Sequence, residues 1–166
     1  GAEIPASLGS LVPEYDCDIH ISFRYNDNKY DGWVSEFTEK LRQELSATLK
    51  DKLSIYIDKR SEDQLADTPV KSLIFIPIIS QTYCDTASPI WKKEFAPFLE
   101  AVKSDIIGPE IKLPNGNGVS RVIPVKIHDI DTDDVKLLES ALSGSMRSVD
   151  LIYRDEGVNR PLRPMD

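Results

Sequence analysis

Glu94 is the side chain of this sequence best placed for chemistry, because it stands among aromatic residues near the start of a predicted helix. At about 100° per residue, one face of that helix carries an apolar arc, which consists of Trp91, Phe95, Phe98, Leu99 and Val102. Glu94 falls at the edge of this arc, whereas Glu100 lies opposite. A carboxylate beside buried rings is a candidate for catalysis. A glutamate that faces solvent or pairs with a nearby cation is the more frequent case, and both interpretations stay open here.

Familiar catalytic and metal-binding motifs are missing from the sequence. It contains no Walker loop, no Gly-x-Gly-x-x-Gly, no Cys-x-x-Cys and no His-Glu-x-x-His. The two histidines, His20 and His128, are far apart in the sequence, and a structural or surface role is more frequent for such residues than a place in a metal site or catalytic triad. We therefore expect no metal site and no bound cofactor.

The element that must position Glu94 is a first strand over residues 16–25. Cys17, Ile19, Ile21 and Phe23 alternate with Asp18, His20 and Ser22, which is the period of a strand. A polar loop, residues 26–31, follows. The carboxyl end of such a strand is where ligands bind in open α/β sheets.

Strands and helices alternate along the rest of the chain. We expect helices over residues 33–49, 88–104 and 133–142, and strands over residues 53–57, 73–79, 122–127 and 149–153. The continuous apolar run 73–79 suits a central strand covered on both faces. Asp31 or Gly32 is expected to cap the first helix, Ser88 and Pro89 to begin the second, and Gly144 to end the third.

Three further features of the pattern concern irregular segments. Pro97 is expected to kink or weaken its helix. Only residues 59–72 connect the second strand to the third, so either the crossover helix is stunted or the chain given lacks residues there. Residues 111–121, with Pro-Asn-Gly-Asn-Gly at their centre, are expected to form a projection closed by a turn.

This order of elements predicts an α/β fold of the flavodoxin-like, three-layer type. Its central five-stranded, mostly parallel sheet has the strand order 2-1-3-4-5, with helices on both faces. The switch point then lies between strands one and three. The loop after Phe23 and the segment after Ile79 should therefore meet.

Length and charge limit the classes of partner. The chain has 166 residues, which fits one domain over residues 15–166 preceded by a leader or linker over residues 1–14. A net charge of -8 argues against a nucleic-acid or anionic-membrane surface. The longest apolar run is strand-sized, so we expect no membrane span. Cys17 and Cys84 suit buried thiols in a reducing compartment, which places the protein in the cytoplasm.

Four segments resemble the sequence boxes of TIR domains. Residues 15–24, Tyr-Asp-Cys-Asp-Ile-His-Ile-Ser-Phe-Arg, are similar to the opening TIR box, and residues 55–58, Ile-Tyr-Ile-Asp, to the strand that leads into the BB loop. Residues 76–91 resemble the pattern of an apolar strand, a serine, an aromatic residue and then Ser-x-x-Trp. Residues 121–125, Arg-Val-Ile-Pro-Val, resemble the fourth strand. The likeness spans residues 15–153, in the expected order.

The resemblance implies one of two functions, namely self-association in signalling or cleavage of NAD by a helical glutamate. The enzymatic type implies Glu94 as catalytic carboxylate, although here it follows Trp91 by three residues rather than the family's usual four. It also implies substrate contacts for Phe23, Arg24, Asp58, Tyr83 and Trp91, with NAD as substrate rather than cofactor. Arg24 is equally well explained as a surface salt bridge, and Trp91 as a core residue.

On this resemblance the chain is expected to be a bacterial NAD glycohydrolase, excised from a larger protein with a flanking sensor domain and activated through TIR–TIR contacts in immune or stress signalling. A non-catalytic homotypic interaction module is the alternative, and it would not require Glu94. A third possibility is another flavodoxin-like enzyme, such as a nucleoside deoxyribosyltransferase, which also uses a glutamate.

Overall fold

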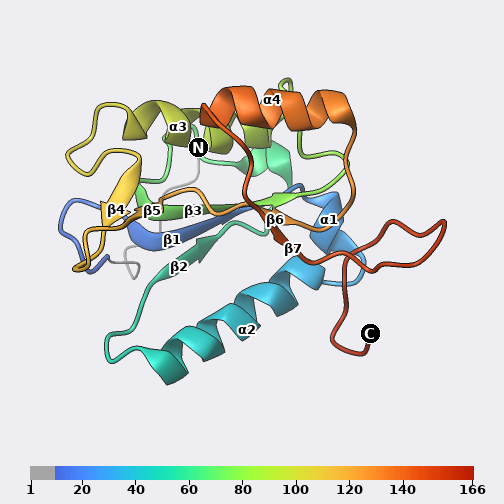
Figure 1. The fold of residues 1–166 in the computed structure, drawn as a ribbon, viewed down its shortest axis with the longest axis horizontal. Coiled ribbons are helices and arrows are strands. Elements are labelled where there is room, and N and C mark those ends of the chain that lie inside the picture. Colours follow the sequence, from blue (N-terminus) through green and yellow to red (C-terminus); the bar gives the residue numbers. More distant parts are fainter. Residues whose placement is uncertain (1–9) are drawn as a thin grey trace.

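The computed structural model describes residues 10–166 and contains a five-stranded, fully parallel sheet in the order β2-β1-β3-β6-β7 (Figure 1). The predicted α/β class and the order 2-1-3-4-5 are confirmed. The strands of this sheet are β1 (Cys17–Ser22), β2 (Ile55–Ile57), β3 (Ser72–Ile79), β6 (Val125–Lys126) and β7 (Val149–Asp150). The strands β4 (Glu110–Lys112) and β5 (Gly118–Ser120) form a separate antiparallel hairpin.

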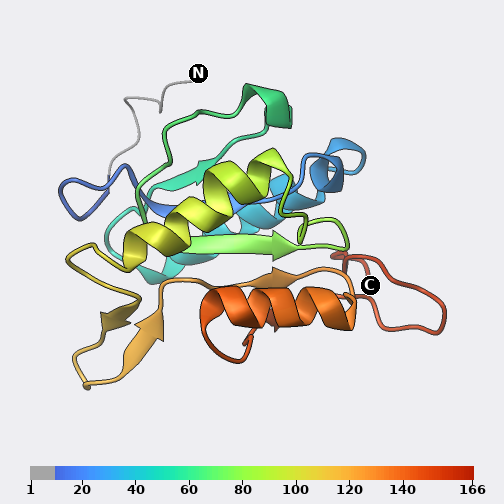
Figure 2. The same ribbon diagram turned by 90° about the horizontal axis from the view of Figure 1, so that it is seen from above.

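Helices cover both faces of the sheet. The helix α2 (Trp33–Thr48) lies on one face, whereas α3 (Ala96–Val102) and α4 (Thr132–Leu142) lie side by side on the other (Figures 1 and 2). A short helix, α1 (Asn26–Lys29), lies at the carboxyl ends of the strands. Each face therefore has its own apolar core, one packed against α2 and one against α3 and α4.

The central strand β3 joins the two cores because its side chains alternate between them. Ile76 and Ile78 belong to the core under α2, and Phe75 and Ile79 to the core under α3. Its register with β1 pairs Ile21 with Ile76 along a parallel ladder. The predicted position of this strand, covered on both faces, is confirmed, and its apolar run is explained by that double burial.

The connection between β2 and β3 contains only a 3-10 turn, η1 (Glu62–Gln64). We call residues 58–71 the crossover segment. In this structure the crossover is therefore short and has no α-helix. Leu65 is the apolar anchor of this segment, since it is buried in the core on the α3 side.

The helix that carries Glu94 is irregular where it begins. Ser88 accepts a hydrogen bond from the Trp91 backbone N–H at 3.1 Å, so the predicted cap is confirmed. The next turn, η2 (Trp91–Phe95), is a π-helical turn, and the Ala96 N–H donates to the Trp91 carbonyl five residues earlier. The wide turn ends just before Pro97, which has no N–H to continue an α-helical ladder. The predicted irregularity at Pro97 thus takes the form of a π turn before it.

Helix ends differ from the prediction in one place. The helix α4 ends at Ser143, which takes the left-handed conformation with φ 58°, and not at Gly144 as predicted. The α2 helix begins as expected, because Gly32 adopts φ 69° and the Asp31 carboxylate accepts from the Trp33 N–H at 3.1 Å. At this same end the indole N–H of Trp33 donates to the Leu162 carbonyl, so the C-terminal segment lies beside the start of α2.

The last two strands are shorter than predicted. The fourth strand of the sheet, β6, covers two residues, and Pro124 lies just outside it, since a proline cannot donate to the ladder. The expected projection over residues 111–121 is the β4–β5 hairpin.

Most of the predicted leader, residues 1–9, lies outside the described residues. Ser10, in the described part of the leader, donates a hydrogen bond to Asp18 at 2.7 Å. In residues 10–166 no helix has the length and apolar character to cross a membrane.

Candidate functional site

The polar face of β1 is buried, although alternating polar and apolar residues are typical of a strand with one solvent-exposed face. Asp18, His20 and Ser22 are at most 2% exposed. Asp18 is satisfied by structural contacts, since its carboxylate accepts from Ser10 and Ser54. His20 and Ser22 point instead toward the π-helical turn, where they meet Glu94.

A chain of hydrogen bonds runs from Tyr83 through Ser22 to Glu94. The Ser22 hydroxyl donates to Glu94 Oε1 at 2.7 Å and lies 2.9 Å from the Tyr83 hydroxyl. A serine hydroxyl has a single hydrogen. Since that hydrogen is given to Glu94, the Tyr83 O–H must donate to Ser22 Oγ. In this chain each hydroxyl donates toward the Glu94 carboxylate.

His20 lies on the other side of the same carboxylate. Its Nε2 is 3.4 Å from Glu94 Oε2 and has no hydrogen-bond partner among the described residues. The imidazole is held edge-on by Tyr56 and Phe75, each with a ring-centroid distance of 5.1 Å. A buried nitrogen without a partner is uncommon and calls for an explanation. Here it faces a carboxylate oxygen at 3.4 Å without the geometry of a hydrogen bond.

Two tyrosines near Glu94 remain protonated at all physiological pH values. Burial raises the pKa of Tyr83 well above its usual value; the Ser22 hydroxyl opposes that rise and the nearby Glu94 carboxylate adds to it. Burial also raises the pKa of Tyr56, with contributions from Asp58 and Glu94. Both phenols therefore act as hydrogen-bond donors and not as bases.

Glu94 is nearly enclosed, with a side-chain exposure of 9%. The neighbouring Lys93 ties this turn to the crossover segment, because its ammonium lies 3.0 Å from Asp67 and 3.4 Å from the Leu65 carbonyl. Leu65 itself is 5% exposed and packs in the core beneath. The crossover segment thus lies against the turn that carries the carboxylate, and a ligand can reach the carboxylate only if neighbouring groups move.

Arg24 is the next residue on the polar side of β1, and it joins the two segments predicted to meet. Its Nη1 donates to the Thr82 carbonyl at 2.6 Å, so the loop after β1 and the segment after β3 are in contact as expected. Its Nε donates to Glu62 at 3.0 Å, and Asp85 lies 3.7 Å away. The charge of Arg24 is therefore balanced by carboxylates, and a phosphate would have to displace Glu62.

Asp58, at the start of the crossover segment, is occupied by its own neighbours. Arg60 donates to its carboxylate through both the backbone and the guanidinium, and Tyr56 lies 3.4 Å away. Burial by itself would raise the pKa of Asp58, but the Arg60 hydrogen bonds outweigh it, and the pKa is lowered. Asp58 is thus an ionised carboxylate that fixes the first turn of the crossover segment.

Phe23 and Trp91 lie in the cores. Phe23 is 3% exposed and belongs to the core under α2, on the opposite face of the sheet from Glu94. Trp91 packs against Phe95 with ring centroids 4.3 Å apart. Of the six predicted site residues, the structure brings Glu94 and Tyr83 together through Ser22, places Arg24 beside Thr82, and leaves the other three outside this hydrogen-bond chain.

Sequence reasoning missed His20, Ser22 and Tyr56 as neighbours of the carboxylate. The available signal was the row of polar residues inside an otherwise apolar first strand. In a sheet covered by helices on both faces, such a row has to be buried, and buried polar groups need partners from the facing helix. Glu94 was predicted on that helix, so the fold class indicated that this row needs partners there, but not which side chains meet.

In the described part of the chain, neither the two cysteines nor any group of His, Cys, Asp and Glu side chains forms a second reactive centre. Cys17 and Cys84 are free thiols, and burial raises the pKa of each to about 12, which keeps them protonated and unreactive. Within residues 10–166 no three His, Cys, Asp or Glu side chains are grouped so that they could hold a metal ion.

Comparisons with known proteins identify no relative. No family model, no curated protein and no solved structure matches this chain. The TIR resemblance therefore remains a prediction, and the arguments about function below rest on the residues around Glu94.

Proposed function

We propose that this protein is a TIR-type NAD glycohydrolase, which cleaves the bond between nicotinamide and ribose with Glu94 as the catalytic carboxylate. The observation that supports this most is the hydrogen-bond chain from Tyr83 through Ser22 to Glu94. It holds one carboxylate at the carboxyl end of β1, beside the segment that leaves β3. This switch point is where ligands bind in sheets of this order.

The chemistry needs little more than a fixed negative charge. Nicotinamide leaves with the electron pair of its bond to C1′ of ribose, and positive charge develops on the ribosyl group, as in glycoside hydrolysis. The Glu94 carboxylate stabilises that charge and accepts hydrogen bonds from the ribose hydroxyls. Water then adds to C1′ and releases a proton, which gives ADP-ribose, or a ribosyl acceptor within the molecule gives a cyclic product.

Substrate entry requires the crossover segment to move away from the Glu94 turn. The contacts that would break are the Lys93 pair with Asp67, which is largely solvent-exposed, and the Arg24 pair with Glu62. Exposed ion pairs contribute about 0 to 1 kcal/mol each. Only the Lys93–Asp67 pair is of this kind, since Arg24 and Glu62 are 20% and 16% exposed and Leu65 is buried. Opening therefore has to be driven by association of subunits, and it frees Arg24 for a phosphate of NAD.

Glu94→Gln is the direct test. Purified protein at high concentration, or crowded so that it self-associates, is expected to release nicotinamide from NAD, and Glu94→Gln should reduce this at least a hundredfold. Glutamine keeps an oxygen that accepts from Ser22, so the fold should survive. The matched control is Glu100→Gln, an exposed glutamate on the same helix, which should leave the rate unchanged. Nicotinamide release is measured by chromatography, and the melting temperature of each variant is recorded alongside.

A non-catalytic interaction module is the second candidate, and the near burial of Glu94 favours it. A carboxylate that is 9% exposed, with Ser22 and His20 around it, also suits a structural polar cluster. In that case no nicotinamide is released even from the clustered protein, and Glu94→Gln lowers the melting temperature as its only effect. Release that survives Glu94→Gln would instead exclude Glu94 as the catalytic group.

The wider setting follows from the same resemblance. We propose a cytoplasmic bacterial protein in which a flanking sensor domain clusters TIR units, so that NAD is hydrolysed in immune or stress signalling. Sedimentation measurements of this chain as a function of concentration, run in parallel with the nicotinamide assay, test whether activity follows self-association.

A further inference from the structure

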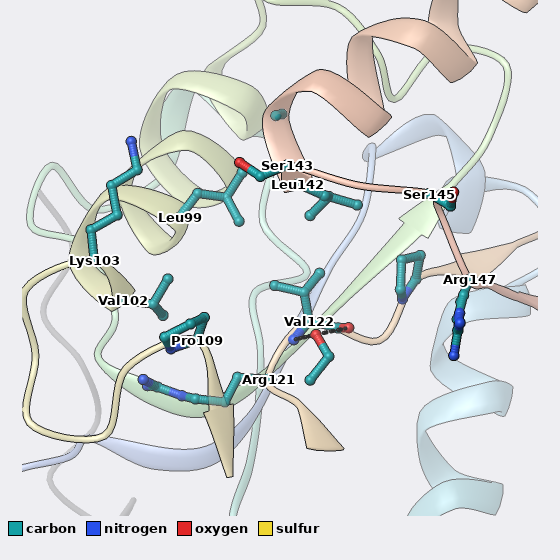
Figure 3. Close-up of a pocket in the computed structure, with 13 residues that line it drawn as sticks. Leu99, Val102, Lys103, Pro109, Arg121, Val122, Leu142, Ser143, Ser145 and Arg147 are labelled. Atoms are coloured by element: carbon teal, nitrogen blue, oxygen red, sulfur yellow. Dashed lines mark hydrogen bonds between the residues drawn. The ribbon is translucent and has the colours of Figure 1, made fainter. Parts of the chain in front are cut away.

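A cavity of about 440 Å³, which Glu94 does not line, lies near the amino-terminal end of β3 (Figure 3). It is bounded by α3, by the C-terminal end of α4 and by the chain around the β4–β5 hairpin. Arg121 lies at this end of the sheet, because its guanidinium donates to backbone carbonyls at the start of β3. The volume falls in the range of roughly 300 to 1,000 Å³ that is usual for small-molecule sites.

The inner wall of this cavity is apolar. Leu99 and Val102 from α3 and Leu142 from α4 gather around the same space as Val122 and Pro109 (Figure 3). Leu99 and Leu142 are only partly buried against the core below. A hydrophobic group that entered the cavity would cover apolar surface that the protein leaves open, which favours binding.

The charge of the lining is opposite to that of the whole protein. The chain has 28 acidic and 20 basic residues. None of the 13 lining residues, all of which belong to the described part of the chain, is Asp or Glu, whereas three are Lys or Arg. In a protein with a net charge of -8, a cavity with this lining selects against cations and accepts an anion.

One of the three lining cations, Arg147, has no partner among residues 10–166 and is free to meet a ligand. Arg121 is not, because its guanidinium already donates to Asp105 and to three backbone carbonyls. Lys103 has only an exposed pair with Glu100 at 3.2 Å. Arg147 makes no side-chain hydrogen bond or ion pair with any residue between 10 and 166. Lys103 and Arg147 stand at opposite ends of the lining, and both side chains are long enough to swing over the opening (Figure 3).

Two serine hydroxyls at the same opening also lack partners. Ser143 and Ser145 follow α4 and are exposed, and neither side chain forms a hydrogen bond within residues 10–166. Hydroxyls can donate to anionic oxygens at little conformational cost. Ser145 and Arg147 lie on the same side of the opening, whereas Ser143 lies beside Leu99 (Figure 3), so Ser145 is the hydroxyl placed to bind an anionic group together with Arg147.

We propose that this cavity is a binding site for a small amphipathic anion, an aromatic or short aliphatic group that carries one anionic oxygen group. The apolar part packs against Leu99, Val122 and Leu142, and the anionic group meets Arg147 and Ser145. This site does not depend on Glu94 or on NAD cleavage. It is a second ligand site in the same domain.

The test uses 1-anilinonaphthalene-8-sulfonate, which has this chemistry, and N-phenyl-1-naphthylamine, which has the same rings without the sulfonate. Each is titrated into the full chain and followed by two-dimensional NMR of the backbone amides. The sulfonate is expected to bind at one site, to shift the amides of Val122, Ser145 and Arg147, and to bind at least tenfold more tightly than the neutral compound.

Two variants separate the contributions of charge and of volume. Arg147→Glu should weaken the sulfonate at least tenfold and leave the neutral compound unchanged, whereas Arg42→Glu, an exposed arginine on α2, should change neither. Ser145→Trp fills the opening from an exposed position and should weaken both compounds. Equal affinities for the two compounds, shifts confined to other parts of the molecule, or an Arg147→Glu variant that binds the sulfonate normally would each overturn the proposal.

Discussion

At the scale of single residues, the Ser22 hydroxyl determines how the candidate site is held. It lies between the fully buried phenol of Tyr83 and the nearly buried carboxylate of Glu94, with hydrogen bonds of 2.9 and 2.7 Å. Without the Ser22 hydroxyl, the Tyr83 phenol and the Glu94 carboxylate would each lose a hydrogen-bond partner in the protein interior, where water does not readily replace it. Such losses cost more than the bonds themselves contribute to stability.

Ser22→Ala is therefore expected to lower the free energy of unfolding by about 1 to 3 kcal/mol. Tyr83→Phe is the matched comparison, because it removes only the donor and keeps the ring packed edge-on against Phe95. It should cost about 0.5 to 1.5 kcal/mol. Urea unfolding of both variants provides the measurement. A Tyr83→Phe variant less stable than Ser22→Ala would show that the hydroxyl of Ser22 does not join the two groups.

At the scale of elements, the π-helical turn decides which way Glu94 points. A regular helix would place Trp91 and Glu94 on one face, three residues apart. In the wider turn the Ala96 N–H reaches back five residues to Trp91. Trp91 consequently lies in the core beside Phe95, while Glu94 faces Ser22 and His20 on β1. Turns of this kind are frequently found at functional sites.

The C-terminal end of α4 provides a prediction about helix termination. Ser143 holds a left-handed conformation, with φ 58°, that costs a residue with a Cβ atom about 1 kcal/mol relative to glycine. Ser143→Gly should therefore raise the free energy of unfolding by about 0.5 to 1 kcal/mol. The control is Ser140→Gly inside the same helix, which should lower it by about 0.5 kcal/mol. Thermal unfolding measures both, and the same sign for the two variants would contradict the assignment of the helix end.

At the scale of the whole molecule, Arg121 ties together segments that are distant in the sequence. It is 1% exposed, and its guanidinium donates to the carbonyls of Ser72 and Leu73, to Gly108 and to the carboxylate of Asp105. The start of the central strand, the end of α3 and the hairpin strand β5 thereby meet at one charged group. Removal of the Arg121 side chain would leave the Asp105 carboxylate without its cation and three backbone carbonyls without this donor, so the fold depends on this residue.

Arg121→Met is expected to lower the free energy of unfolding by about 3 to 5 kcal/mol, because the Asp105 carboxylate and three carbonyls lose their donor. Arg154→Met is the control. Arg154 pairs with Asp129 at 2.9 Å in an exposed position, and its loss should cost less than about 1 kcal/mol. Denaturant unfolding at pH 7 compares the two, and similar losses would show that burial of the Arg121 pair has no special effect.

The Arg121 pair also predicts a dependence on pH. Burial would raise the pKa of Asp105, but the hydrogen bonds from Arg121 and Gly108 outweigh it and lower the pKa below its usual value. A carboxylate with a depressed pKa stabilises the fold above its unfolded pKa of about 4, and that contribution is lost as the pH falls through the folded value. The stability difference between wild type and Arg121→Met should therefore shrink below about pH 4. Asp58, whose pKa is also lowered, contributes equally to both proteins and cancels.

Local patterns in the sequence were sufficient for the order of elements. The apolar positions of α2 recur every three or four residues, the run over β3 has the length of a strand, and Ser88 with Pro89 marks a helix start. Because a parallel strand must return by a crossover, this order of elements also predicted the arrangement of the sheet. The predicted meeting of the loop after Phe23 with the segment after Ile79 followed, and Arg24 contacts Thr82 there.

The partners of Glu94 were decided by the tertiary structure. The sequence by itself placed Glu94 on a helix and Ser22 at the end of a strand, through periods of 3.6 and 2 residues that need only local information. These two side chains are 72 positions apart in the sequence. That they meet depends on the π-helical turn before Pro97 and on the burial of a polar strand face. Each of these is set by packing between elements, where a buried hydroxyl or carboxylate takes whichever partner the facing element offers.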